Sequence, residues 1–144
     1  MFRTMKILKY ILLSLLLTVA MPTEMQAKRI KAPKMYMFGF SASFQDSIIY
    51  MTDVQEVVGA WYDTKTKFLL GRQHYSYQLK DFLANTKQQP NRVCVVMFAL
   101  SRKEAEKKFI KMRKEYTVKA KGKYDVRYLT MSEFKFEPVD MSEQ

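Results

Sequence analysis

The sequence predicts an α+β fold, a single small domain in which two helices pack on a mixed β-sheet. Stretches with an apolar residue at every second position alternate with two stretches whose apolar residues recur at helical spacing. The 117 residues after residue 27 suit one mixed α/β domain, and 48% of the chain is hydrophobic. The expected order is β-β-α-β-α-β, with one extra strand at the end as an alternative.

Residues 1–27 have the pattern of a secretory signal peptide. They open with three basic residues, Arg3, Lys6 and Lys9. A mostly apolar run of 11 residues follows, which is shorter than the roughly 20 that span a bilayer. Cleavage is expected after Ala27, with Ala20 as the alternative, and no cysteine stands near either position to carry a lipid. We therefore expect a periplasmic or secreted protein with no stable membrane span after cleavage.

The first elements of the domain are predicted from alternation. Residues 28–34 are basic and indicate a flexible lead. Residues 36–44 alternate aromatic with small or polar side chains, which predicts a strand with one aromatic face. A turn at residues 45–47 leads to a β-branched strand at 48–58, and the short connection predicts an antiparallel hairpin. Residues 59–71 show no clear pattern.

The middle of the domain predicts a helix followed by a strand. Four apolar residues share one helical face: Tyr75, Leu79, Phe82 and Leu83. Ser76 is the expected N-cap of this helix, which should end near Asn85. Residues 92–100 then form a nearly continuous apolar run, which is typical of a central strand covered on both faces.

The second helix has the strongest local signal. Ser101 and Glu104 have the spacing of a capping box. One stripe is apolar (Ala105, Phe109, Met112, Tyr116), and a separate row is charged (Lys103, Lys107, Lys111, Lys114). The strand, helix and strand of residues 92–131 predict parallel strands joined by a right-handed crossover.

The end of the chain has an alternating pattern. Residues 124–128 predict a strand, and the same alternation continues through Phe134 and Phe136. That pattern indicates either one bent strand or two strands. Residues 138–144 are expected to fray.

Charge is distributed unevenly along the chain. The whole chain carries 25 basic and 14 acidic residues. Residues 92–127 hold 12 basic and four acidic residues, whereas residues 35–64 hold four acidic residues and no basic one. A dipolar molecule of this kind attracts anions to its positive flank. The expected partner is therefore an anionic component or protein of the cell envelope.

Arg72 and His74 are the candidate anion-binding residues. His74 is the only histidine, and both residues stand just ahead of the first predicted helix. Free N–H groups and the helix dipole attract anions to a helix N-terminus. The alternative interpretation is an ordinary polar loop.

Other chemistry finds little support in the sequence. Cys94 lies within an apolar run, which indicates a buried hydrophobic residue rather than an activated thiol. A glycosidase needs two carboxylates held across a groove, and nothing in the sequence fixes such a pair among the acidic candidates Asp46, Asp53, Glu56 and Asp63. Met35 and Met37 fit a core better than a copper site. The sequence predicts no catalytic residue, metal site or cofactor.

Nucleic acid is a weak candidate partner. Tyr36, Phe38 and Phe40 could stack on bases, as aromatic residues do on some RNA-binding sheets. The helices of the domain need the same face for packing. Export also separates the protein from most cellular nucleic acid, so the sequence argues against this partner.

Three stretches resemble small exported proteins of Gram-negative bacteria that have no known activity: residues 38–47, 52–57 and 75–79. The resemblance covers most of the mature chain and implies export and single-domain size, without any site residues. The leading hypothesis is a non-enzymatic periplasmic or secreted binding module. The alternative is a small hydrolase or anion-binding protein centred on Arg72 and His74.

Overall fold

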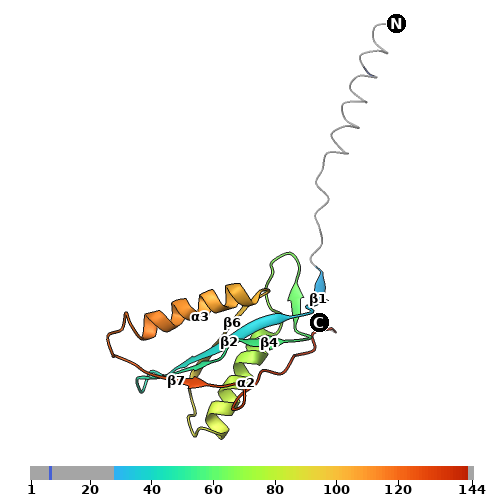
Figure 1. Cartoon of the computed structure of the whole chain (residues 1–144). Helices are drawn as coiled ribbons and strands as arrows, with labels where there is room; N and C mark the ends of the chain where they lie inside the picture. The colour runs from blue at the N-terminus through green and yellow to red at the C-terminus, as the bar shows by residue number, and fades with distance from the viewer. Residues whose placement is uncertain (1–6, 8–27, 143–144) are drawn as a thin grey trace.

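The computed structural model describes Ile7 and residues 28–142. These residues form a five-stranded mixed sheet with two helices, together with a short two-stranded ribbon (Figure 1). The predicted α+β fold is confirmed. The predicted signal peptide lies outside the described residues, apart from Ile7.

Strand β2 (Met35–Ala42) is the centre of the sheet. It pairs antiparallel with β6 (Val93–Ala99) along one edge, and with β3 (Ile48–Thr52) and β4 (Gln55–Val57) along the other. The last strand, β7 (Asp125–Leu129), pairs parallel with β3. Strands β6 and β7 therefore run in the same direction, as predicted, but lie at opposite edges of the sheet.

A bulge interrupts the second predicted strand. Phe40 lies opposite Met51, whereas Met37 lies opposite Gln55, so the β3–β4 side holds one extra residue. The predicted single strand over residues 48–58 is therefore two short strands. Beside the break, Thr52 Oγ1 accepts a hydrogen bond of 2.8 Å from the Gly39 N–H.

The two helices cover opposite faces of the sheet (Figure 1). Helix α2 (Arg72–Asn85) packs on the face that carries Met35 and Met37. Helix α3 (Arg102–Tyr116) lies over Phe38 and Phe40 on the other face. Alternate side chains of β2 point to opposite faces, so both faces are core. The prediction of one aromatic and one small or polar face missed that the second face is also buried.

The predicted start is correct for one helix and wrong for the other. Ser101 Oγ accepts a hydrogen bond of 3.3 Å from the Glu104 N–H and caps α3. Helix α2 begins at Arg72, after a left-handed Gly71 with φ 69°, and not at Ser76. Glycine adopts this conformation readily and can begin the helix without a side-chain cap. His74 consequently lies inside the first helical turn.

The basic lead is a strand rather than a flexible segment. Strand β1 (Arg29–Lys31) pairs antiparallel with β5 (Trp61–Asp63). The Thr64 N–H donates a 2.9 Å hydrogen bond to the Lys28 carbonyl, and Lys31 Nζ lies 5.7 Å from the Trp61 ring centre. Both strands have only three residues, β1 exposed and β5 half-buried throughout, so neither carries the alternation that predicts a strand.

The segment after β7 is irregular but well packed. Within residues 130–142 no further strand forms, so the extra-strand alternative was wrong. Gln55 holds the segment instead. Its side-chain amide donates a 2.9 Å hydrogen bond to the Phe134 carbonyl and accepts a 2.8 Å hydrogen bond from the Phe136 N–H. The Val139 N–H donates to the Tyr75 hydroxyl, and Met141 is buried. Val139 and Met141 therefore lie against the domain, and the expectation that residues 138–144 fray stays a prediction.

Candidate binding site along strand β6

Strand β6 is an edge strand, so the prediction of a central strand at residues 92–100 was wrong. Among the described residues it pairs with β2 alone. Its apolar composition has another cause, because α2 and α3 both pack against it from opposite faces. Its first half is partly uncovered, with Val93 48% and Val95 37% exposed.

Two cations cover part of the β6 edge. Arg72 Nε donates a 2.7 Å hydrogen bond to the Val96 carbonyl, and Lys108 Nζ donates a 2.8 Å bond to the Phe98 carbonyl. Backbone groups of residues two apart in a strand point to the same side. Residues 94, 96 and 98 therefore present their backbone N–H and carbonyl groups at the open edge.

A groove of about 520 Å³ lies between α3 and β6. It is lined by Met97, Lys108, Lys111, Met112, Glu115, Tyr116 and Tyr124. Thioether and aromatic side chains give this lysine groove apolar surface, while two ammonium groups and one carboxylate supply charge. Such a mixture suits a ligand with both apolar and anionic groups.

A second hollow, of about 580 Å³, lies on the α2 side of the same strand. It is lined by Phe44, Gln73, Ser76, Tyr77, Lys80, Asn91, Arg92, Val93 and Cys94. Within this tyrosine hollow, Gln73 Nε2 donates a 2.6 Å hydrogen bond to the Tyr77 hydroxyl. Phe44, at the end of the β2–β3 hairpin, is 98% exposed.

The structure does not bring Arg72 and His74 into one of these two hollows. Side chains two residues apart in a helix point in different directions. Arg72 reaches the β6 edge, with its guanidinium carbon 5.3 Å from the Phe98 ring centre. His74 is exposed on the first turn of α2. The anion site at these two residues stays a prediction.

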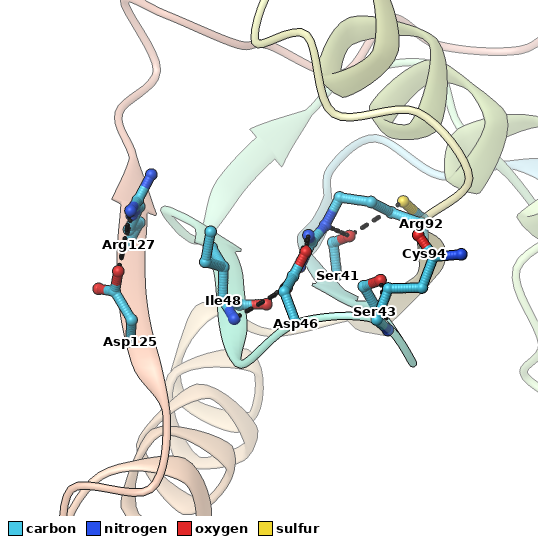
Figure 2. Close-up of polar contacts among 9 residues, drawn as sticks. Ser41, Ser43, Asp46, Ile48, Arg92, Cys94, Asp125 and Arg127 are labelled. Carbon is cyan, nitrogen blue, oxygen red and sulfur yellow. Dashed lines mark hydrogen bonds and ion pairs between the residues drawn. The ribbon is translucent and has the colours of Figure 1, made fainter.

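Arg92 is the main polar anchor of the region and was not singled out in the sequence. Figure 2 shows its buried guanidinium among groups from the β2–β3 hairpin. Its Nε donates a 3.0 Å hydrogen bond to Ser41 Oγ, and its Nη1 lies 3.3 Å from both carboxylate oxygens of Asp46. Its Nη2 donates to the Ile48 carbonyl, and its guanidinium carbon lies 5.0 Å from the Tyr50 ring centre. These contacts tie the start of β6 to the hairpin.

The carboxyl of Asp46 makes the fold sensitive to acid. The hydrogen bond from the Ile48 N–H, followed by those from Arg92, lowers the pKa of Asp46 below its ordinary value. A lowered folded pKa stabilises the fold above the unfolded pKa of about 4, and this contribution disappears as pH falls through the folded pKa.

We expect the melting temperature of Asp46→Asn to fall less steeply than that of the wild type below about pH 4. Asparagine keeps an acceptor for the Ile48 N–H but carries no charge to lose. Thermal unfolding followed from pH 6 to pH 2 checks this expectation. Parallel curves for the two proteins would contradict it.

Cys94 is half-buried at the wall of the tyrosine hollow. Burial raises the pKa of its thiol, which disfavours the thiolate needed for nucleophilic attack. Its Sγ donates a weak 3.5 Å hydrogen bond to Ser41 Oγ. The thiol therefore packs at the wall of the hollow and is held near Ser41 Oγ.

The remaining sequence candidates have structural contacts. The Asp53 carboxylate accepts a 3.2 Å hydrogen bond from the Met131 N–H. The Glu56 carboxylate forms ion pairs with Lys34 Nζ at 3.6 Å and with Arg102 Nη2 at 3.8 Å. Asp63 accepts hydrogen bonds from its own loop at residues 65 and 66. Met35 and Met37 are fully buried in the core. These carboxylates take part in separate contacts that hold loops and strands.

Comparisons with family models, with curated proteins and with solved structures gave no match for this chain. The resemblance to exported proteins of Gram-negative bacteria therefore stays a prediction. Among the described residues, no helix combines the length and hydropathy that a membrane span requires.

Proposed function

We propose that this chain is an exported, non-enzymatic binding protein of the cell envelope, and that it takes a negatively charged partner along β6. The observation that carries the proposal is the lysine groove, which combines an apolar lining with the ammonium groups of Lys108 and Lys111. A partner with apolar groups could cover the methionine and tyrosine side chains while its negative charges meet the lysines.

Charge around the groove supports an anionic partner over a neutral one. Helix α3 holds seven basic and three acidic residues. Two of those acidic side chains, Glu104 and Glu106, lie outside the lining of the lysine groove. A positive surface of this kind raises the local concentration of anions and speeds their association.

Charge reversal tests the groove as the binding site. Anilinonaphthalene sulfonate, which joins an apolar body to one negative charge, is a suitable fluorescent probe. We expect the double variant Lys108→Glu/Lys111→Glu to bind this probe about tenfold more weakly than the wild type. Fluorescence titration of the purified protein measures the dissociation constant.

The matched control is Lys103→Glu/Lys114→Glu, which makes the same charge change on the same helix away from the groove. It should keep most of the affinity of the wild type. An equal loss of affinity in both double variants would show general attraction to the helix and contradict the groove as the site. Melting temperatures confirm that each variant is folded.

Export is tested separately by expressing the whole chain in a Gram-negative host. We expect mature protein in the periplasm or medium whose first residue is Lys28, or Met21 if cleavage follows Ala20. N-terminal sequencing and mass spectrometry identify the cleavage site. Uncleaved protein in the cytoplasm would contradict the proposed export.

A further inference from the structure

The open edge of β6 lies between the two depressions described above. Met97 lines the lysine groove, while Cys94 lines the tyrosine hollow on the other side of the strand. We propose that an extended acidic segment of a partner protein adds to the sheet as a strand beside β6. This inference rests on the proposed function, because it names the partner class and the binding mode for the same surface.

Strand addition requires an edge whose backbone groups pair with no other strand, and room for alternate side chains. Within the described residues β6 offers both. The backbone N–H and carbonyl groups of residues 94, 96 and 98 face the edge, where they can pair with an added strand. Successive side chains of that strand would point to opposite faces of the sheet. They would enter the lysine groove and the tyrosine hollow in turn, as in other peptide-binding sheet edges.

Arg72 and Lys108 occupy this edge in the unbound protein, and an added strand would displace them. Each now donates to a carbonyl that an added strand would reach with its own N–H group. Arg72 Nη2 also lies 3.8 Å from Met97 Sδ, so the guanidinium crosses the strand from one face toward the other. Once displaced, both cations could pair with carboxylates of the added strand. Long cationic side chains are also a common protection of exposed edges in the unbound state.

Charge favours an acidic partner over a second copy of this chain. Four cations surround the edge: Arg72, Lys80, Lys108 and Lys111. Pairing of β6 with β6 would place these charges against their own copies, which is unfavourable. A segment rich in glutamate or aspartate would neutralise them.

Backbone methylation of a peptide probe tests the binding mode. The probe is a capped, fluorescent octapeptide of alternating valine and glutamate, compared with two versions methylated on the valine amides or on the glutamate amides. We expect the parent peptide to bind, one methylated version to lose about tenfold or more, and the other to stay within about twofold. Only every second N–H of an added strand faces its neighbour, so only one version blocks pairing. Fluorescence anisotropy with the purified wild-type protein measures all three affinities.

Four outcomes would overturn strand addition. Equal affinity for all three peptides would show attraction through side chains alone. The proposed function would survive that result. If the protein binds anilinonaphthalene sulfonate but none of the peptides, the acidic strand is rejected and the proposed function is not. If the protein binds neither the peptides nor anilinonaphthalene sulfonate, the proposed function is rejected as well. A stable dimer with protected β6 amides and no peptide binding would assign the edge to a second copy.

Discussion

Phe136→Ala is expected to lower the free energy of unfolding by about 3–5 kcal/mol. Phe136 is 1% exposed and packs edge-on against Tyr75 and Phe134, with ring centres 6.2 and 4.8 Å away. Its ring also approaches Gly39 at the centre of β2. Alanine would leave a cavity between the sheet, α2 and the C-terminal segment. Chemical denaturation of wild type and variant measures the change.

Phe44→Ala is the matched control, since it removes the same ring from an almost fully exposed position. We expect its unfolding free energy to stay within about 0.5 kcal/mol of the wild type. Similar losses in the two variants would contradict the packing of the C-terminal segment. A small effect of Phe136→Ala alone would do the same.

Arg92→Met is expected to cost about 3 kcal/mol of unfolding free energy. Methionine roughly fills the volume of the arginine stem but removes the hydrogen bonds that Arg92 donates to Ser41 Oγ and to the Ile48 carbonyl. Arg92→Lys should also be clearly less stable, because one ammonium group cannot reproduce the planar set of donors around this site. Equilibrium denaturation at pH 7 compares both variants with the wild type.

Arg127→Met is the control for Arg92, and Figure 2 shows both arginines. Arg127 makes its ion pair with Asp125 at 2.9 Å, but both side chains are about half exposed. Exposed pairs contribute little to stability, so this change should have a much smaller effect than Arg92→Met. Equal effects would show that the hydrogen bonds of the buried guanidinium contribute no more than a surface pair.

Local signals in the sequence predicted the elements that depend on local contacts. Ser101 marked the start of α3, because a serine side chain caps the helix that follows it. Asp46 lies in the predicted turn, where its carboxylate accepts from the Ile48 N–H two residues on. The alternation of residues 36–42 predicted β2 because each side chain packs on one face or the other.

Features that depend on distant partners could not be predicted in this way. The side-chain amide of Gln55 bonds to the backbone of Phe134 and Phe136, which lie 79 and 81 positions further along the chain. Phe134 and Phe136 alternate like a strand because their side chains enter the core from an irregular segment. Strands β1 and β5 are only three residues long, and they pair across 30 or more residues of sequence. No short window of sequence contains these pairings.

The candidate site was only partly visible in the sequence. The positive flank was predicted, but the charged row grouped Lys111 with outward-facing lysines and missed Lys108 beside β6. The apolar run at residues 92–100 could not distinguish a central strand from an edge strand covered by two helices. Arg92 offered a weak signal, as a single charge at the start of that run. Its partners from the β2–β3 hairpin appear only in the fold.

An NMR titration with anilinonaphthalene sulfonate tests the central claim most directly, because backbone amide shifts locate the bound anion. The account predicts the largest shift changes in the lining of the lysine groove, at Met97, Lys111, Met112 and Tyr116. The ribbon of β1 and β5 should remain unchanged. Changes centred on His74 or on that ribbon, or no saturable change anywhere, would contradict an anion-binding site along β6.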